Sequence, residues 1–229
     1  MVSRALMGVW AFLDFCLLGS GIIAVAFSVL WRKPDTLMNM VLSNGNLTSG
    51  MALGIALLIT FLFSVGAIVQ RNHVTIGLVI LNYLLILDGL AIIIIGTFVW
   101  VATLRERDDF HIVYSRVPTS ARVFIQEKFS CCGYFNGSDL NEPSTFCNPT
   151  QTSFINALDP NDVNNSKFFC VTPVTNFADV TLNNIFTTIY GFMAVVLCLL
   201  LATLCVINMR KEEERFKRID AKRGGKGFV

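Results

Sequence analysis

The chain has 229 residues, of which 54% are hydrophobic and only 15% are charged, and its mean hydropathy is +0.61. An ordinary soluble domain carries roughly 25% charged residues, so this composition excludes a water-facing fold and indicates several membrane spans. The net charge of +2 is too small to predict binding to nucleic acid, and the positions of the charges are more informative than their sum.

Four segments are apolar over about the 20 residues that a helix needs to cross a bilayer. They cover residues 5–30, 50–69, 74–102 and 185–207. All six prolines fall between these segments, as expected for continuous helices that make their backbone hydrogen bonds internally. The sequence therefore predicts an all-α protein with a four-helix transmembrane bundle. The other segments are a short N-terminus (1–4), a small loop (31–49), a turn (70–73), a large loop (103–184) and a basic tail (208–229).

The large loop is predicted to be mainly helical. Residues 103–117 can continue the third span out of the membrane, Pro118 interrupts this helix, and residues 120–129 form a second amphipathic stretch. Residues 171–184 lead back into the fourth span. The polar stretch from 136 to 167 is the part of the chain that is freest to vary and to bind something else.

The basic tail predicts the orientation in the membrane. Residues 208–229 hold eight of the 18 Lys and Arg residues, and short basic segments stay on the cytoplasmic side. With four spans, both termini are then cytoplasmic and both longer loops extracellular, although Arg32 and Lys33 favour the opposite orientation of the first hairpin. Acceptor triplets for N-glycosylation lie only in the predicted outer loops, at Asn46, Asn136 and Asn164. A plasma membrane or endomembrane location fits this topology.

An alternative for the first span is a cleaved signal peptide, because Ala24-Val25-Ala26 has the small residues of a cleavage site. The apolar run is longer than a signal peptide needs, continues past this site and carries Asp14, which favours a retained helix. The large loop is outside in either case.

The seven cysteines fall into two groups. In an exported polar segment of 40 residues, four cysteines predict two disulfides, because such a segment is too small for a stabilising apolar core. Zinc is the alternative, but the spacings do not suit a zinc ligand pair. Of the three pairings that the sequence allows, bonding between the adjacent Cys131 and Cys132 is disfavoured, which leaves two. The outer cysteines are Cys131, Cys132, Cys147 and Cys170, and those in spans are Cys16, Cys198 and Cys205.

The topology and the motif Cys131-Cys132-Gly133 resemble those of tetraspanins. Like that family, the chain combines four spans, a short first outer loop, a tiny inner loop and a large second outer loop. Residues 124–130 (Phe-Ile-Gln-Glu-Lys-Phe-Ser) are similar to the helix before the motif, and residues 143–147 (Pro-Ser-Thr-Phe-Cys) to the proline-containing motif of the third cysteine. The resemblance covers nearly the whole chain. It implies pairing of Cys131 with Cys170 and of Cys132 with Cys147.

The chain also departs from the family. Residues 64–67 read Ser-Val-Gly-Ala where the family often has a Gly-Cys-Cys-Gly-like run, so the usual acylation sites there are missing, and the fourth span has no Glu or Gln. The short tails and the small number of cysteines are similar to those of filamentous-fungal tetraspanins, a group linked to appressorium-mediated host penetration.

Polar side chains inside the predicted spans are further candidates: Asp14, Asn82 and Asp88. A carboxylate is costly in hydrocarbon, so both aspartates should face the bundle. The rise per residue puts Asn82 at nearly the same depth as Asp14, which predicts an interhelical hydrogen bond between these two residues. Asp88 is expected nearer the outer half, close to Tyr190.

Small residues at four-residue spacing allow the first two spans to approach closely. They are Ser20, Ala24 and Ser28 in the first span and Gly50 and Gly54 in the second.

Cys205 lies about one turn from the cytoplasmic end of its span and is a candidate for acylation, with simple packing as the alternative. Cys16 and Cys198 lie deeper and are expected to pack as small apolar residues. In the tail, residues 215–219 are candidates to contact an anionic leaflet, with a plain stop-transfer anchor as the alternative.

No hydrolase, metalloprotease, phosphate-loop or dinucleotide motif is present, so we expect no enzyme, no metal and no catalytic cofactor. The resemblance implies a scaffold that binds and laterally clusters other integral membrane proteins through its spans and large loop. It also implies contacts with membrane lipids, a sterol or lipid held between the spans, and compatibility with a homo-oligomer. One alternative is a junction-type four-span protein, disfavoured because its large loop would be the first. The other is a small transporter or channel subunit that uses Asp14 and Asp88.

Overall fold

The computed structural model describes residues 4–69 and 76–222, which form α-helices and one short 3-10 helix and contain no strand. The all-α prediction is therefore confirmed for these residues. The chain divides into two compact units. Unit 1 comprises the described residues of Met1–Leu30, Leu47–Gly96 and Thr188–Val229, and unit 2 comprises Trp31–Asn46 and Thr97–Thr187. The predicted turn at 70–73 lies outside the described residues.

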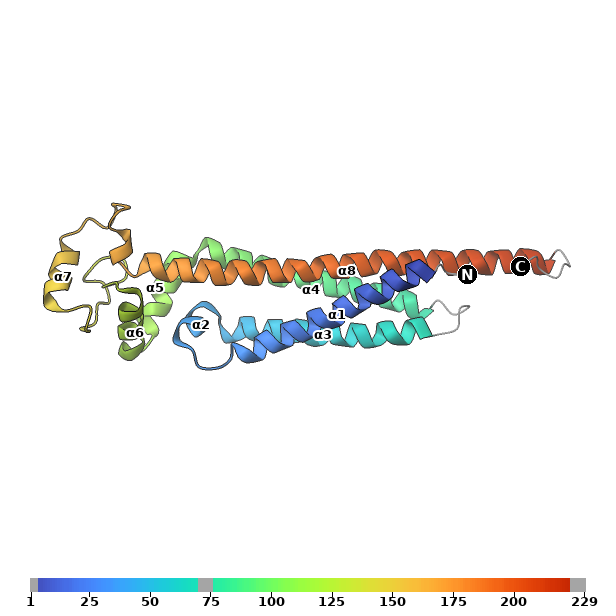
Figure 1. Ribbon diagram of the computed structural model, residues 1–229, viewed down its shortest axis with the longest axis horizontal. Helices are drawn as coiled ribbons and strands as arrows, with labels where there is room; N and C mark the ends of the chain where they lie inside the picture. The colour runs from blue at the N-terminus through green and yellow to red at the C-terminus, as the bar shows by residue number, and fades with distance from the viewer. Residues whose placement is uncertain (1–3, 70–75, 223–229) are drawn as a thin grey trace. The chain divides into compact units, whose positions relative to one another are not determined.

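Four helices are long and apolar enough to cross a membrane, which indicates an integral membrane protein (Figure 1). They correspond to the four predicted spans but are longer at several ends. Thus α3 begins at residue 44 rather than 50, and α8 contains the predicted span 185–207 within 52 helical residues. Pro173 is tolerated because it lies in the first turn of α8, where its missing N–H costs no hydrogen bond. The four helices are α1 (Arg4–Leu30), α3 (Asn44–Val69), α4 (Ile76–Leu104) and α8 (Val171–Lys222).

In unit 1, α1 and α3 pack through small residues. A Cβ added to Gly54 would lie 2.9 Å from the backbone nitrogen of Val25 and 3.0 Å from the Cβ of Ala24. One turn earlier in α3, a Cβ on Gly50 would lie 3.0 Å from Ser28 Oγ. The prediction that small residues let the first two spans touch is therefore confirmed.

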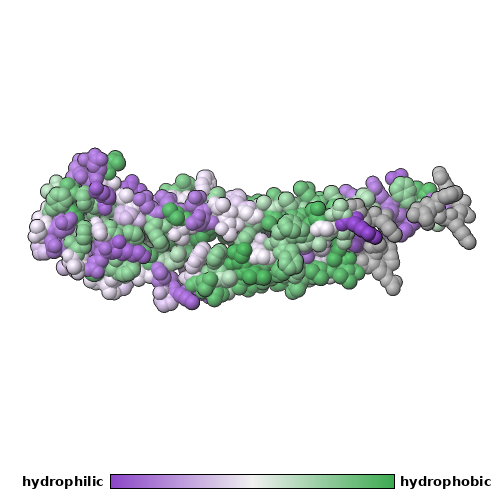
Figure 2. Space-filling model, viewed as in Figure 1, coloured by the Kyte–Doolittle hydropathy of each residue, from purple (hydrophilic) through white to green (hydrophobic). Residues whose placement is uncertain are grey.

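Also in unit 1, α4 packs on α8 along one face. Gly89 lies against Met193, and Gly96 lies against the ring of Tyr190. The buried leucines and isoleucine of α4 lie at 78, 81, 85 and 92, three, four and seven residues apart, as expected for a helix with one buried stripe. Large apolar side chains on the remaining faces of the unit 1 helices are exposed, and Figure 2 shows such hydrophobic residues on this unit. These faces suit contact with lipid.

Polar contacts also join the helices of unit 1. The indole Nε1 of Trp10 donates to Thr203 Oγ1 at 3.2 Å, which links α1 to α8. Arg210 is only 3% exposed, and its Nη2 donates to the carbonyl oxygen of Ile68 at 3.5 Å. The first basic residue of the predicted tail is therefore part of the bundle, positioned near the C-terminal end of α3, where a cation is favoured.

Unit 2 is built from short helices and the ends of α4 and α8. The predicted continuation of the third span over 103–117 is interrupted at Arg105, which has φ −116° and ψ 8°. The amphipathic stretch predicted at 120–129 lies in α6. Asn148 caps α7 by accepting the backbone N–H of Gln151 at 2.8 Å. The short helices are α2 (Thr36–Val41), α5 (Glu106–Arg116), α6 (Thr119–Phe129), α7 (Pro149–Asn156) and η1 (Ser166–Phe168).

Candidate functional site

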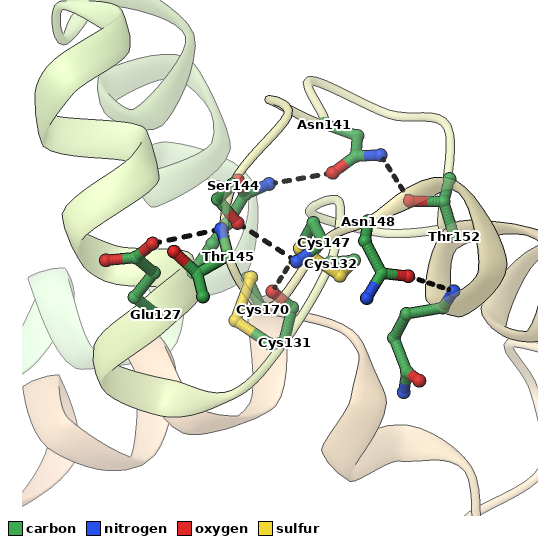
Figure 3. Close-up of a disulfide and its surroundings, with 12 residues drawn as sticks. Glu127, Cys131, Cys132, Asn141, Ser144, Thr145, Cys147, Asn148, Thr152 and Cys170 are labelled. Atoms are coloured by element: carbon green, nitrogen blue, oxygen red, sulfur yellow. Dashed lines mark hydrogen bonds between the residues drawn. A yellow bond between two sulfur atoms is a disulfide. The ribbon is translucent and has the colours of Figure 1, made fainter.

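Two disulfides hold the centre of unit 2 together (Figure 3). The structure pairs Cys131 with Cys170 and Cys132 with Cys147, with Cα atoms 5.0 Å and 5.7 Å apart. This is the pairing that the resemblance implies. Because Cys131 and Cys132 follow each other directly, the two bonds tie the end of α6 both to the start of α8 and to the segment before α7. All four cysteines are buried.

The third residue of the motif has a conformation that requires glycine. Gly133 has φ +71°, and a Cβ at this position would lie only 1.9 Å from the carbonyl oxygen of Asn136. A residue with a side chain would therefore be strained and would collide with the backbone. The tight turn brings the backbone N–H of Tyr134 within 2.8 Å of the carbonyl oxygen of Asp139.

Backbone hydrogen bonds extend the disulfide link. The N–H of Cys132 donates to the carbonyl oxygen of Phe168 at 3.0 Å, and the N–H of Cys170 donates to that of Gly133 at 2.9 Å. The N–H of Val171 donates to the carbonyl oxygen of Tyr134 at 3.2 Å. The motif and the start of α8 are thus paired over several residues, so they form one rigid base.

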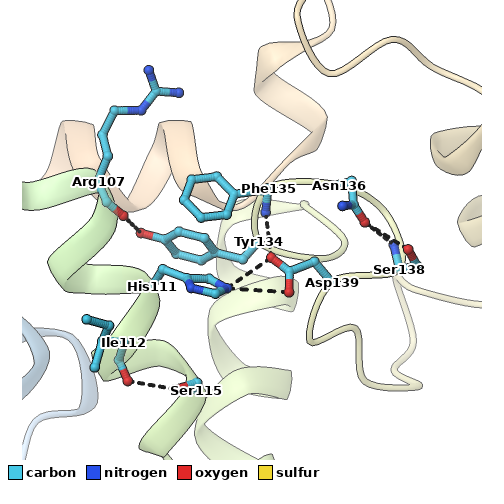
Figure 4. Close-up of polar contacts among 9 residues, drawn as sticks. All are labelled: Arg107, His111, Ile112, Ser115, Tyr134, Phe135, Asn136, Ser138 and Asp139. Atoms are coloured by element: carbon cyan, nitrogen blue, oxygen red, sulfur yellow. Dashed lines mark hydrogen bonds and ion pairs between the residues drawn. The ribbon is translucent and has the colours of Figure 1, made fainter.

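An aromatic cluster joins this base to α5 (Figure 4). The hydroxyl of Tyr134 donates to the carbonyl oxygen of Arg107 at 3.2 Å, and its ring centroid lies 5.1 Å from those of His111 and Tyr114. His111 Nε2 lies 3.1 Å from a carboxylate oxygen of Asp139. Burial, the largest effect, raises the pKa of the Tyr134 phenol well above its ordinary value, so this group stays a neutral donor.

Polar contacts from α6 position the segment that leads to Cys147. Arg122 Nε donates to Glu142 Oε1 at 2.9 Å, and Glu127 Oε1 accepts the backbone N–H of Thr145 at 3.1 Å. Further along, the side chain of Asn141 donates to Thr152 Oγ1 at 3.3 Å (Figure 3). These contacts connect α6 to α7 through side chains that are far apart in the sequence.

On this base, unit 2 presents an exposed, partly aromatic surface, which we call the α7–η1 surface and define by Phe154, Val163, Lys167 and Phe168. Phe154 is 51% exposed and Val163 is 84% exposed. The rings of Phe154 and Phe168 meet edge to face at 5.9 Å, and Lys167 Nζ lies 5.2 Å from the Phe168 ring centroid. Aromatic side chains that are exposed as Phe154 is are enriched at protein-binding surfaces. A hollow of about 430 Å³ adjoins this surface, lined by Arg107, Pro160, Asn161, Asp162, Val163, Ser166, Thr172 and Thr175.

The three asparagines of the acceptor triplets, Asn46, Asn136 and Asn164, are all exposed. The side chain of Asn136 accepts from the N–H and the hydroxyl of Ser138, and the side-chain nitrogen of Asn164 donates to Asp162 Oδ1 at 3.1 Å. Each asparagine thus has room for a glycan. Their use as glycosylation sites stays a prediction.

The intramembrane acids lie inside unit 1, as the cost of a lipid-facing carboxylate predicts. Asp14 is 4% exposed and Asp88 is 6% exposed; their neighbours are Ser64 and Thr60, one turn apart on α3. Among the described residues, Oδ1 of Asp14 and Oδ1 of Asn82 have no hydrogen-bond partner. Ser64 takes the place beside Asp14 that the sequence assigned to Asn82, because equal depth says nothing about which face of each helix the side chains occupy.

The partner expected for Asp88 also differs. The Tyr190 ring lies against Gly96, eight residues further along α4, whereas the side chain next to Asp88 is that of Thr60.

The thiols of the predicted spans are more exposed than expected. Cys198 and Cys205 are exposed and Cys16 is half-buried. Cys198 was expected to pack as a small apolar residue, but its side chain is exposed, because the apolar run does not indicate which helix face is covered by neighbouring helices. Cys205 is open to modification, and its acylation stays a prediction.

Two features of the site had no signal in the sequence. His111 and Asp139 are 28 residues apart, with α6 between them. The acid pair of Glu106 and Asp179 is formed by residues more than 70 positions apart. In the described parts of the chain, no three His, Cys, Asp or Glu side chains are grouped so as to hold a metal ion. Comparison of the chain with models of protein families, with curated proteins and with solved structures finds no match.

Proposed function

We propose that this protein is a tetraspanin-like membrane scaffold that binds other integral membrane proteins and clusters them laterally. The observation that carries the proposal is the doubly disulfide-bonded Cys131-Cys132-Gly133 base, which presents the exposed α7–η1 surface. Four helices that can cross a membrane accompany it. The supporting role in host penetration that the fungal resemblance implies belongs to the same proposal.

The geometry suits binding more than catalysis. The base of unit 2 is held by two disulfides and by backbone pairing, so little conformational entropy is lost when a partner docks on the α7–η1 surface. Apolar and aromatic side chains at such a surface supply most of the binding free energy. In the proposed orientation, unit 2 faces the extracellular or lumenal side and both termini are cytoplasmic.

Replacing Phe154 and Val163 by serine tests the proposal. We expect co-purified membrane proteins to be reduced about tenfold or more in mild detergent, because truncating a central anchor of an interface costs about 2 kcal/mol. Phe124→Ser is the matched control, since Phe124 is 47% exposed but lies on α6. If the double variant retains the same partners as wild type while Phe124→Ser behaves identically, the α7–η1 surface is not the binding site.

A lipid in the bundle is part of the same proposal. An apolar hollow of about 370 Å³ between α3 and α4 supports it, lined by Leu62, Phe63, Gly66, Ala67, Gly77 and Ile80. Photoactivatable sterol and phospholipid probes would label peptides from these two helices.

A second candidate function is transport of protons or cations. It is favoured by one observation, namely that the buried Asp14 and Asp88 each have a carboxylate oxygen without a hydrogen-bond partner among the described residues. Purified protein in liposomes would then conduct ions, and Asp88→Asn would abolish the flux. Absence of flux in the wild type rejects this candidate.

A further inference from the structure

The junction of α4 and α5 in unit 2 is a break between two helices. α4 ends at Leu104, Arg105 leaves the helical conformation without a side-chain cap, and α5 begins at Glu106. The buried side chains of Phe110 and Tyr114 anchor the rest of α5. Movement of α5 is therefore restricted to its first turn, which carries Glu106.

Two carboxyl groups meet at this break. The carboxyl of Glu106 faces that of Asp179, which projects from the part of α8 in unit 2. Glu106 Oε2 is buried and has no hydrogen-bond partner among the described residues, whereas Asp179 is exposed. Asp179 also lines a hollow of about 470 Å³, together with Trp100, Thr103, Val180, Asn183 and Phe186. Two adjacent carboxylates repel unless one of them is protonated.

The surroundings of Glu106 offer little compensation for a second negative charge. Arg107, the next residue in α5, is the cation that acts on Glu106, and Figure 4 shows its side chain extending away from Tyr134 and His111. α2, which contacts α5, has no ionisable side chain, and the Tyr134 phenol is neutral.

Burial and the neighbouring charged groups together set the pKa of Glu106. Burial acts most strongly, the nearby Asp179 carboxyl adds to it, and Arg107 opposes them; together they raise the pKa of Glu106 from 4.5 to about 7.

We propose that Glu106 and Asp179 form a pH-sensitive latch that holds the first turn of α5 against α8 when the two carboxyls share a proton and releases it when the proton is lost. The folded unit binds this proton more tightly than the unfolded chain does. The contribution of the latch to stability is therefore fully present below pH 4.5, the ordinary range of a glutamate, and is lost as the pH rises through about 7. The latch does not depend on the proposed scaffold function, since it involves neither a partner nor the α7–η1 surface.

Hydrogen exchange of the full chain in lipid nanodiscs decides whether the latch exists. Wild type and Glu106→Gln are compared at one pH, about 8, so that intrinsic exchange rates are equal. The amide side chain mimics a permanently protonated carboxyl, so we expect amides in the first turn of α5 to exchange several-fold faster in wild type. At about pH 5.5 the two proteins should exchange alike. Equal rates at both pH values would overturn the proposal.

Fluorescence emission from Trp100, which lines the hollow beside Asp179, measures the pH midpoint at which the Glu106–Asp179 pair loses its shared proton. In a Trp10→Phe/Trp31→Phe background, we expect a change centred near pH 7 that is absent in Glu106→Gln. Asp179→Asn should lower the midpoint, because it removes the repulsion but not the burial. Asp109→Asn is the matched control, since it removes an exposed charge from the same helical turn. A transition near pH 7 that persists in Glu106→Gln would overturn the assignment to this pair.

Discussion

At the scale of single residues, the most constrained position is Gly133, where conformation and space both demand glycine. Its φ of +71° disfavours any other residue, and the Asn136 carbonyl oxygen occupies the place of a Cβ. The turn sets the direction of Tyr134, whose hydroxyl reaches α5. One residue thus determines whether the disulfide-bonded base can form.

We expect Gly133→Ala to prevent correct pairing of the outer cysteines, because a Cβ would lie 1.9 Å from the Asn136 carbonyl oxygen. Thiol labelling of the non-reduced protein measures the outcome. Gly191→Ala is the control: a Cβ there meets nothing within 4 Å, and α8 should gain up to about 1 kcal/mol in helix propensity. Fully oxidised Gly133→Ala protein would contradict this account.

A second residue-level prediction concerns the bond between Trp10 and Thr203 in unit 1. A double-mutant cycle with Trp10→Phe and Thr203→Val should give a coupling free energy of about 0.6 kcal/mol, the typical value for a hydrogen bond between membrane helices. Thermal unfolding in detergent provides the unfolding free energies of the wild type, the two single variants and the double variant. Strict additivity of the two changes would show that the contact adds no stability.

At the scale of elements, unit 2 depends on covalent links because its helices are short. α5 and α6 have 11 residues each and α7 has eight, and isolated helices of this length are marginal in water. Caps such as Asn148 and ion pairs such as that of Arg122 with Glu142 specify the geometry. The disulfides supply stability that so small a core lacks.

Removal of each disulfide should therefore lower the stability of unit 2 by a different amount. Cys131 and Cys170 are 39 residues apart, and Cys132 and Cys147 are 15 apart. Loop-closure entropy predicts losses of about 4 and about 3 kcal/mol, respectively, for paired alanine substitutions. Protease resistance of unit 2 as a function of denaturant gives both numbers. A larger loss for the shorter loop would show that local packing, rather than chain entropy, dominates.

At the scale of the whole molecule, the distribution of apolar and polar side chains indicates which part of the protein lies in the membrane. The unit 1 helices expose large apolar side chains such as Phe15 and Leu87, whereas unit 2 carries the polar segment from 136 to 167 and the acceptor asparagines Asn136 and Asn164. The described part of the basic tail belongs to unit 1. The proposed orientation follows from this distribution of charge.

If unit 2 is exported, changing Asn136 or Asn164 to Gln should each remove one glycosidase-sensitive mass step, because both side chains are exposed. A bulky, membrane-impermeant thiol reagent should also label unit 2 on intact cells after mild reduction. Labelling only after permeabilisation, together with no glycan at either position, would show the opposite orientation.

Local sequence signals predicted a large part of this fold. Long apolar runs indicated the four long helices, and the spacing of Gly50, Gly54, Ala24 and Ser28 indicated that α1 and α3 touch. Hydropathy did not place the ends of α8, because polar residues such as those between 208 and 222 remain helical where no proline or glycine stops them. A helix can therefore be longer than the segment of it that crosses the membrane.

What the amino-acid order could not supply was the rotation of each helix and the pairing of distant side chains. Depth along α1 and α4 gave Asp14 the wrong partner, and nothing in the sequence brought Glu106 next to Asp179. Hydrophobicity and backbone propensity act between near neighbours and can be recognised along the chain. Contacts across more than 70 residues depend on how whole helices pack, and that is settled by side-chain fit throughout a unit.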